Sequence, residues 1–489
     1  MSTTTRAQTA RHSHRAEHTA PDTQPQLTAL GVLTLLMGAF LPIADFFIVN
    51  VALPSISATL HTSGAALELV VAGYGIAYAS LLVLGGRLGD RFGRRTVFLV
   101  GLAAFVVLSL ACGLAPDGGF LLGARILQGA AAALLVPQVL ASFHAGLAGE
   151  RKVRALAMYG AISGLAAVVG QVAGGFLVTA DIAGTQWRPI FLINVPIGVL
   201  VAAFAGRVVP DSRSPHAATV DVPGTVLFAA TLTALLVPLT EGQSLGWPAW
   251  SRVLLASVPL LGFATYRFEA RTERRGGMPL LPPSLLRLPS FSRGLSIVLP
   301  FAAGFGAFMF VFALTLQQGL HADALRSGVA ILPMAVMFLA GSSVSPKIIS
   351  RFGRGALAGG AVVQIVGLGA LIAITATQWP HVTLPEMAVP LALAGAGQSL
   401  MFTGLFRAVL VDCPPHQGGI GSGMLITIQQ SGLALGVATL GSLFVARAAT
   451  SVPDGFATAV GVQIGLVVLL ALGIRTLPRF TRPNPTASR

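Results

Sequence analysis

The sequence predicts an all-α protein that crosses a membrane fourteen times, and three observations support this class. Of the 489 residues, 54% are hydrophobic and 10% are charged, with a mean hydropathy of +0.79, whereas about a quarter of the residues in soluble proteins carry a charge. Long apolar stretches recur, and each reaches the roughly 20 helical residues that cross a hydrocarbon core of about 30 Å. Lys and Arg residues gather in alternate connecting segments, as the positive-inside rule predicts.

The predicted spans are arranged as six, two and six. The first six lie near residues 27–50, 66–86, 96–115, 120–142, 154–179 and 188–206, a pair follows near 222–240 and 251–267, and six more lie near 294–317, 326–346, 355–376, 386–409, 419–446 and 456–476. We therefore expect an N-terminal six-helix bundle at 27–206, a linker with two extra helices at 207–293 and a C-terminal six-helix bundle at 294–477. Residues 1–26 and 478–489 are expected to be cytoplasmic tails, the first of them disordered because it is polar.

The distribution of positive charge predicts the orientation. With both termini in the cytoplasm, the cytoplasmic segments hold 26 of the 31 Lys and Arg residues. The outside segments hold Arg188, Arg252, Arg326 and Arg447, and Arg125 lies within a span. Cytoplasmic loops therefore account for the net charge of +14, and we expect no nucleic-acid partner. The predominance of arginine over lysine favours a bacterial source, and hence a multi-pass protein of the bacterial inner membrane.

A short loop between the second and third spans carries the clearest local pattern. Residues 85–101 read GGRLGDRFGRRTVFLVG and place five charges between two apolar runs. The segment 345–354, SPKIISRFGR, aligns with this loop and falls between the second and third spans of the last six. Parallel six-span repeats are typical of transporters that rock two bundles about a central site. The loop is therefore either a topology anchor or part of a gate between the bundles.

Five segments carry family signatures: ADFFIVNVALPSI at 44–56, GGRLGDRFGRR at 85–95, ARILQGAAAALLVPQ at 124–138, GAISGLAAVVGQVAGG at 160–175 and WRPIFLINVPIGV at 187–199. In this order they resemble the major facilitator superfamily, and the fourteen spans are similar to its drug:proton antiporter family. The resemblance implies a monomer whose cytoplasmic gating loop latches the two bundles. In that loop, Asp90 is expected to dock against a helix N-terminus of the opposite bundle. The loop residues that match are Gly86, Asp90, Arg91, Gly93, Arg94 and Arg95.

Two charged residues lie within the spans. Asp45 is the only acid deep inside a span, and a carboxylate at that depth is functional by default because its burial is costly. We expect it to couple to protons or to a cationic substrate; the alternative is a structural Asp hydrogen-bonded to neighbouring helices. Arg125 is the only base within a span and has to be paired or hydrated. The resemblance implies that Arg125 assists proton coupling, and the alternative is an arginine satisfied by backbone carbonyls.

The fifth predicted span is rich in glycine. Small residues on one helix let another helix pack closely against it. The segment resembles the antiporter motif that is associated with export, although Gln171 stands where that motif usually has a proline. Glycine-mediated packing with no meaning for transport direction is the alternative. The glycines are Gly160, Gly164, Gly170, Gly174 and Gly175.

A substrate cavity is expected to be lined by uncharged polar and aromatic side chains from several spans. Phe305 and Phe312 belong to a face of phenylalanines at helical spacing, and such a face more often meets lipid or another helix than a ligand. If this face lines the cavity, it suits a bulky apolar compound, and Asp45 is then the acid available to a cationic one. The candidates are Gln138, Asn194, Phe305, Phe312, Gln317, Gln398 and Gln429.

Enzymatic functions find no support in the sequence. It has no GxSxG, Walker or HExxH motif, and Cys112 and Cys413 show no metal-ligand spacing, so we expect no metal and no cofactor. Any work is therefore driven by an ion gradient. We predict proton-driven efflux of hydrophobic or amphipathic molecules such as antibiotics, dyes or secondary metabolites. The alternatives are a proton-coupled importer of a small metabolite on the same fold, and a non-transporting membrane sensor or enzyme.

Overall fold

The structure, a computed structural model, describes residues 27–213, 221–242, 245–277, 279–413 and 418–476, and both predicted tails lie outside these ranges. Within them the chain forms helices and no β-strand. The long helices are α1 (Ala29–Ile48), α3 (Gly64–Phe92), α4 (Arg94–Gly113), α5 (Gly118–Gly146), α6 (Gly149–Ala180), α8 (Asn194–Val208), α9 (Val222–Glu241), α10 (Ala249–Arg274), α12 (Pro289–Leu314), α14 (Leu332–Phe352), α15 (Arg354–Gln378), α16 (Leu384–Leu410), α17 (Gly418–Gly436) and α19 (Val452–Gly473). Shorter helical segments are η1 (Val49–Val51), α2 (Leu53–Leu60), η2 (Ile182–Gly184), α7 (Pro189–Leu192), α11 (Pro283–Leu286), η3 (Thr315–Gly319), α13 (Ala324–Ala330), η5 (Val437–Gly441), α18 (Ser442–Ala448) and η6 (Ile474–Thr476).

Fourteen helical runs in the described ranges are long and apolar enough to cross a membrane. Each predicted span falls on one of them, which confirms the all-α polytopic fold. Several runs join consecutive segments: α12 continues through η3, and α13 continues into α14. The helices are also longer than the predicted spans, because polar turns extend them beyond the apolar stretch. For example, α6 begins at Gly149, whereas the predicted span begins near 154.

Polar side chains mark where several helices begin. The side chains of Thr28, Ser63, Asp117 and Asp323 accept hydrogen bonds from backbone amides in the first turns of α1, α3, α5 and α13. Asp221 caps α9 in the same way. These caps satisfy amides that a helix leaves without an internal partner. The sequence therefore places the helix starts at the borders of the apolar stretches.

The two halves of the chain share the connection between their second and third spans. Gly93 joins α3 to α4 at φ 103°, and Gly353 joins α14 to α15 at φ 56°. Glycine adopts positive φ at little cost, which suits the Arg-Phe-Gly-Arg sequence that both halves carry here. The loops at residues 86–95 and 267–293 lie at the same end of the molecule, where Arg87 donates a hydrogen bond to the carbonyl of Pro279. We term this the arginine-rich end.

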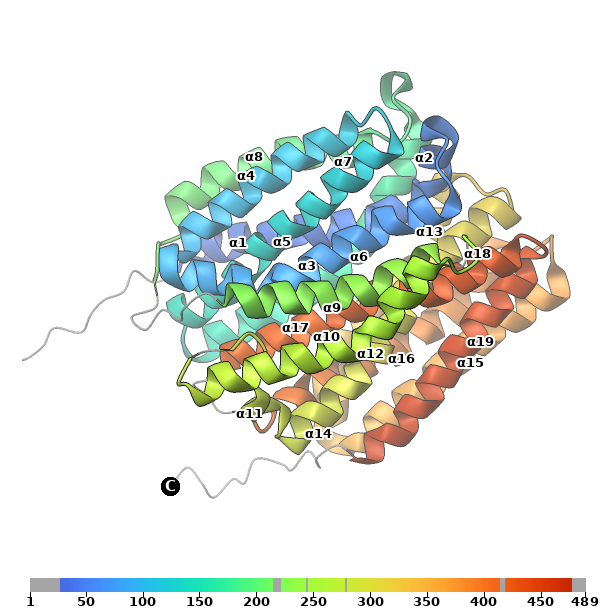
Figure 1. Ribbon diagram of the computed structural model, residues 1–489. Helices are drawn as coiled ribbons and strands as arrows, with labels where there is room; N and C mark the ends of the chain where they lie inside the picture. Colours follow the sequence, from blue (N-terminus) through green and yellow to red (C-terminus); the bar gives the residue numbers. More distant parts are fainter. Residues whose placement is uncertain (1–26, 214–220, 243–244, 278, 414–417, 477–489) are drawn as a thin grey trace, which may run out of the picture.

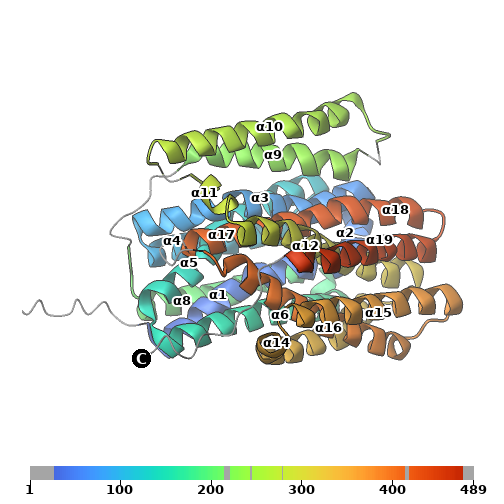
Figure 2. The ribbon, with the colours of Figure 1, turned by 90° about the horizontal axis from the view of Figure 1, so that it is seen from below.

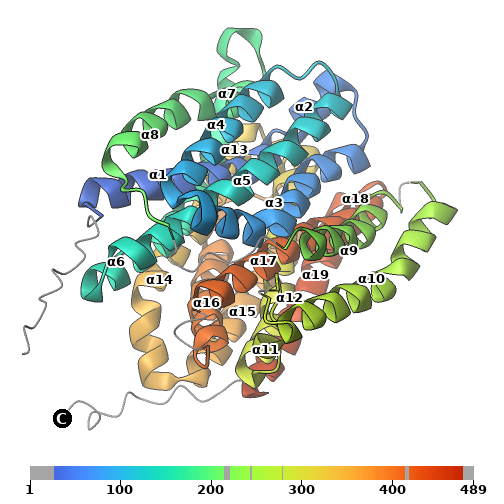
Figure 3. The ribbon, with the colours of Figure 1, turned by 60° about the vertical axis from the view of Figure 1, so that its left-hand side comes forward.

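The long helices form two bundles that lie side by side (Figures 1 and 3). In the N-terminal bundle α3, α4 and α5 pack together and α1 packs against α6 and α8; in the C-terminal bundle α14, α15 and α16 pack together and α12 packs against α16, α17 and α19. The bundles meet along two seams, one between α3 and α17 with its continuation into η5 and α18, the other between α6 and α13 with α14. Both seams run through a buried apolar core that the bundles share.

The two inserted helices form an outer pair beside the bundles (Figure 2). α9 packs against α3 of the N-terminal bundle and η5 of the C-terminal bundle, and α10 packs mainly against α9. Leu260 and Phe263 of α10 are 69% and 60% exposed, as expected for a helix that faces lipid. The insertion therefore contacts both bundles at one seam.

Candidate functional site

A cavity of about 490 Å³ lies between the two bundles. Side chains of α1, α3, α5 and α6 line one part of it, and side chains of α12, α14, α16 and α17 line the rest. Its volume falls within the range of about 300–1,000 Å³ that is common for small-molecule sites. Among the residues that the structure describes, no Asp, Glu, Lys or Arg lines the cavity. The cavity is therefore large enough for a molecule of drug size.

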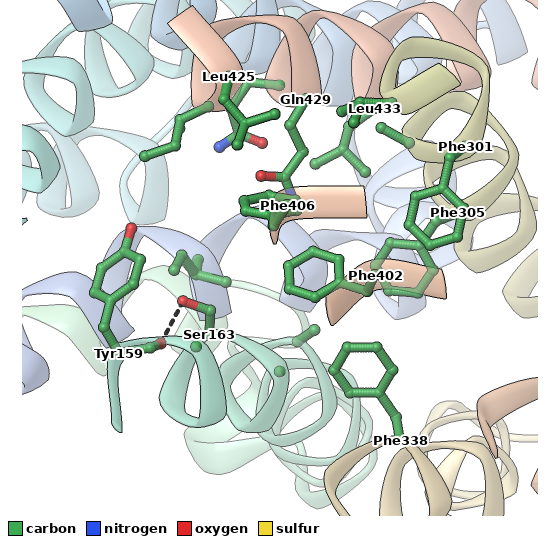
Figure 4. A pocket seen from close by; sticks show the side chains of 18 of the residues that line it. Tyr159, Ser163, Phe301, Phe305, Phe338, Phe402, Phe406, Leu425, Gln429 and Leu433 are labelled. Carbon is green, nitrogen blue, oxygen red and sulfur yellow. Dashed lines mark hydrogen bonds between the residues drawn. The ribbon is translucent and has the colours of Figure 1, made fainter. Parts of the chain in front are cut away.

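Phenylalanines form one wall of the cavity (Figure 4). Phe402 lies at the centre of this wall, with its ring centroid 4.4 Å from Phe406, 5.7 Å from Phe338 and 6.5 Å from Phe301. Three helices supply the cluster, because Phe402 and Phe406 are one turn apart on α16, Phe338 comes from α14 and Phe301 from α12. Aromatic rings attract one another in tilted and edge-to-face arrangements. The wall can therefore hold a flat aromatic ligand.

A few polar side chains are distributed around this apolar surface. Tyr159 and Ser163 of α6 line the cavity, and the Ser163 hydroxyl donates to the Tyr159 carbonyl at 2.8 Å (Figure 4). Gln429 and Gln430 of α17 line it as well. So does Gln398 of α16, whose Oε1 atom is buried with no protein partner. A small number of polar groups in an apolar pocket orients a ligand by hydrogen bonding.

The cavity extends toward one end of the molecule and is closed at the other. Toward the arginine-rich end it is lined by His144, Leu410 and Cys413, which lie at or just beyond the ends of α5 and α16. At the opposite end the bundles touch, since the amide of Leu325 donates to the hydroxyl of Thr179 at 3.1 Å. This conformation therefore presents its central cavity toward the arginine-rich end.

The glycines of α6 allow the close approach at the shut end. A Cβ atom at Gly175 would collide with the backbone of Ala324 in the C-terminal bundle. At Gly170 it would collide with the backbone of Ala44, and at Gly174 with α1 and η1. Gly175 thus controls the distance between the bundles, whereas Gly170 and Gly174 control packing within one bundle. The remaining two of the predicted set, Gly160 and Gly164, line the cavity.

Of the seven side chains predicted to line the cavity, Phe305, Gln398 and Gln429 do so. Phe312 does not, although it lies on nearly the same helix face as Phe305. Seven residues of helix advance the chain by about 10 Å, and Phe312 stacks instead on Phe308, with a centroid distance of 5.4 Å. Helical spacing therefore predicted the face but not the depth of the cavity.

The other predicted cavity residues also lie elsewhere. Gln138 donates to the carbonyl of Gly85 at 2.8 Å, behind the gating loop. Asn194 is bound to Asp45, and Gln317 lies in η3, beyond α12. Phe338, Phe402 and Phe406 line the cavity but could not be predicted from the sequence. An apolar residue within a span has the same sequence pattern whether it faces lipid or a cavity.

Asp45 and Arg125 form an ion pair inside the N-terminal bundle, with exposures of 1% and 0%. The second carboxylate oxygen of Asp45 accepts hydrogen bonds from Asn194 at 2.6 Å and from Gln128 at 3.2 Å. Arg125 also donates to the backbone carbonyl of Val70 at 3.3 Å. Four helices, α1, α5, α8 and α3, therefore meet at this pair.

An aromatic ring completes the surroundings of the pair. The guanidinium of Arg125 lies 4.2 Å from the ring centroid of Tyr74, a cation–π contact that stabilises a desolvated cation. Asp45 itself does not line the cavity, whereas the next two residues, Phe46 and Phe47, do. The expectation that Asp45 offers its charge to a cation in the cavity is therefore corrected: the carboxylate lies behind the cavity wall.

The gating loop packs against the start of the linker. Asp90 at the end of α3 accepts a hydrogen bond from Arg94, the first residue of α4, at 2.8 Å. The backbone amide of Arg94 donates to the carbonyl of Ser212 at 3.0 Å, and Arg95 donates to the carbonyl of Val209 at 3.5 Å. Arg94, the ion-pair partner of Asp90, thus belongs to the same bundle in this conformation. Of the other loop residues, Gly86 lies near Pro137, Gly93 lies beside the carboxylate of Asp211, and Arg91 stacks on Phe92.

Comparison with known proteins agrees with the class that the fold and the cavity define. Residues 35–437 match the sequence profile of the Major Facilitator Superfamily, and the chain belongs to this family of membrane transporters. A solved structure of an auto-inhibited POT family peptide transporter has a TM-score of 0.66 to this chain, with 17% identity, and covers 93% of this chain and 98% of that one. At this identity the likeness shows the shared fold alone.

Relatives with higher identity carry names of antibiotic export or resistance. The "Probable actinorhodin transporter" of Streptomyces coelicolor is 37% identical over 445 residues, which cover 89% of this chain and 77% of the relative. The "Cephamycin export protein CmcT" of Amycolatopsis lactamdurans is 34% identical and covers 94% of both chains. The "Puromycin resistance protein pur8" of Streptomyces alboniger is 32% identical and covers 90% of both. The chain is thus a multi-pass membrane transporter related to antibiotic exporters.

Proposed function

We propose that this protein exports hydrophobic or amphipathic antibiotics and related secondary metabolites across the bacterial inner membrane in exchange for protons. The observation that carries the proposal is the aromatic cavity between the bundles, which presents the Phe402 cluster and, within the described residues, no Asp, Glu, Lys or Arg. Relatives named for antibiotic export or resistance support the same class of substrate. A hydrophilic metabolite would find few partners in this cavity, which disfavours import of such a solute.

The direction of transport rests on the orientation of the chain. Positive charge favours the cytoplasm, so the arginine-rich end is assigned to that side. The cavity then opens toward the cytoplasm, and the contact between α6 and α13 closes it from the outside. Rocking of the two bundles would separate Gly175 from Ala324 and expose the cavity to the outside. A substrate that enters from the cytoplasm would then leave on the opposite side.

Proton coupling is assigned to Asp45 and Arg125. A proton on Asp45 would cancel the charge that holds Arg125 and its amide neighbours in place. Because Phe46 and Phe47 follow Asp45 on α1 and line the cavity, a change at the ion pair acts on the cavity wall through less than one turn of helix. In this scheme proton and substrate influence each other through the position of α1, without touching.

Transport by purified protein in liposomes tests the proposal. The vesicles carry an imposed pH gradient, and the substrates are a planar aromatic antibiotic and, for comparison, a small hydrophilic metabolite. We expect the antibiotic to move against its own gradient, with a matching proton flux, and to stop when a protonophore is added. Gradient-independent movement of the antibiotic, or preferential movement of the hydrophilic compound, would contradict the proposal.

A further inference from the structure

Glu68 is a second buried acid, located near the start of α3 at the end of the molecule opposite the arginine-rich loops. Its side chain is 2% exposed. It is hydrogen-bonded to Ser442, at the junction of η5 and α18 in the C-terminal bundle, with 2.5 Å between Glu68 Oε2 and Ser442 Oγ. The carbonyl of Leu239 in α9 lies 3.4 Å from the same hydroxyl. The N-terminal bundle, the C-terminal bundle and the insertion therefore meet at this carboxyl group.

The number of available hydrogens limits the possible arrangements around the carboxyl. Ser442 Oγ faces three acceptors: Glu68 Oε2, the Leu239 carbonyl and, at 3.0 Å, the carbonyl of Ala438. A serine hydroxyl has one hydrogen and donates to one of them, whereas two oxygens 2.5 Å apart need a hydrogen between them. The hydrogen between Ser442 and Glu68 is therefore the serine hydroxyl hydrogen or, when the serine donates to Ala438 in the preceding turn of its helix, a hydrogen of the carboxyl itself.

The charges around Glu68 favour the arrangement in which the carboxyl is protonated. The titratable groups on the elements packed against this end of α3 are His61 after α2, Asp117 at the start of α5, Glu241 of α9 and Arg447 of α18, together with Arg125, which is engaged by Asp45. His61, Asp117 and Arg447 are exposed, and Glu241, which acts on Glu68 electrostatically, is itself an acid. No ion pair of the described residues brings a cation to Glu68. A buried carboxylate without a cation is strongly disfavoured in a membrane protein.

We propose that Glu68 is a proton-binding site of the seam between α3 and α18, protonated while this seam is closed. The inference rests on the proposed alternation between two access states, and it is independent of the substrate. When the seam opens, water reaches the carboxyl and the proton leaves to the side opposite the arginine-rich loops. Closing the seam takes a proton from that same side. Glu68 therefore makes closure depend on the pH of one compartment, and its proton is not carried across the membrane.

The opening of the seam can be measured directly. Spin labels at His61→Cys and Arg447→Cys, in a background with Cys112→Ser and Cys413→Ser, report the distance across the seam in lipid nanodiscs without substrate. We expect the ratio of open to closed seam to rise with pH in the otherwise unchanged protein, by at most about tenfold per pH unit for one proton. With Glu68→Gln, which keeps a hydrogen-bond donor but cannot ionise, the seam should stay closed throughout. Glu241→Gln is the matched control and should keep the pH response.

Two results would overturn the proposal: a pH response in Glu68→Gln equal to that of the parent protein, or no response in the parent. Infrared spectroscopy supplies a second measurement that does not depend on the labels. A protonated carboxyl band present near neutral pH should vanish in Glu68→Gln, and its persistence would also count against Glu68. Because neither measurement needs a substrate, a failure of the proposed antibiotic export leaves both outcomes interpretable.

Discussion

Asp45 and Glu68 are both carboxyl groups buried in the N-terminal bundle, but their partners differ in kind and in location. Asp45 meets a guanidinium and two amide donors, whereas Glu68 meets a single hydroxyl. The partners of Asp45 all belong to its own bundle, while Ser442 belongs to the other bundle. Rocking of the bundles would therefore leave the surroundings of Asp45 intact and separate Glu68 from its partner. The location of its partners thus indicates which step of the cycle a buried acid can sense.

The largest effect is expected from breaking the ion pair of Asp45. Asp45→Asn leaves the guanidinium of Arg125 buried without a counter-charge, and removing one partner of a buried pair costs about 3–5 kcal/mol. We expect a low yield of folded protein and no gradient-driven transport. The thermal midpoint of the purified protein in detergent and antibiotic transport in liposomes measure the two effects.

A double variant separates folding from coupling. Asp45→Asn combined with Arg125→Gln removes both charges and leaves no uncompensated ion. We expect the thermal midpoint to recover while export stops responding to the pH gradient. If the double variant exports at a normal rate in response to the gradient, the pair has no part in coupling.

Substitution of Glu68 is expected to have a smaller effect on the free energy of unfolding, and one of opposite sign to that of Asp45→Asn. Glu68→Gln keeps the size of the side chain and removes its charge, so the closed seam no longer has to hold a carboxylate without a cation. The parent protein should lose stability as the pH rises, by at most about 1.4 kcal/mol per pH unit, and the variant should not. Thermal midpoints recorded in parallel at acidic and alkaline pH test this, and parallel curves for the two proteins would refute it.

Neither Asp45 nor Glu68 lines the cavity, so we expect substrate affinity to depend on the aromatic wall around Phe402. Phe402→Ala removes ring contacts worth about 0.5–1.5 kcal/mol, and the KM for a planar aromatic substrate should rise roughly two- to tenfold. Phe176→Ala is the control, because it removes the same side chain at a position on α6 that is 56% exposed. It should leave KM unchanged. Equal changes in both variants would mean that Phe402 does not contact the substrate.

The smallest effect on stability is expected at a third acid, Asp90. Its side chain is 34% exposed and pairs with Arg94 across the Gly93 junction, and partly exposed pairs contribute about 0.2–1 kcal/mol. Asp90→Asn should therefore change the thermal midpoint very little. A decrease as large as that of Asp45→Asn would show that Asp90 has a buried partner.

The spans, the repeat and the need of Arg125 for a partner or water followed from the sequence for simple physical reasons. Apolar length, Arg-rich loops and glycines at positive φ are local features, and a charged side chain within a span is costly unless it is paired or hydrated. That the partner of Arg125 is Asp45 came from the structure. The roles assigned to these residues in proton coupling and gating remain predictions. The sequence thus indicated the positions, such as Asp45 and Arg125, where burial of a charge is costly.

The cavity wall and the Glu68 site could not be found in this way. Phe402 and Phe406 lie in an apolar span, where composition does not distinguish a cavity from lipid. Glu68 lies near the border of its span, where an acid looks like an ordinary boundary residue, and its partner is 374 residues away in the chain. Both features depend on the contact between the bundles. That contact cannot be predicted from the order of residues within a single helix.

The described residues place no Asp, Glu, Lys or Arg around the cavity, and this has an electrical consequence. If the cargo is neutral, as this surface favours, its passage moves no charge through the membrane field. An exchange of one proton for one neutral molecule then carries a single positive charge inward per cycle. The membrane potential would add about 2.3 kcal/mol per 100 mV to the work available from that proton, so that voltage, as well as the pH difference, would drive export.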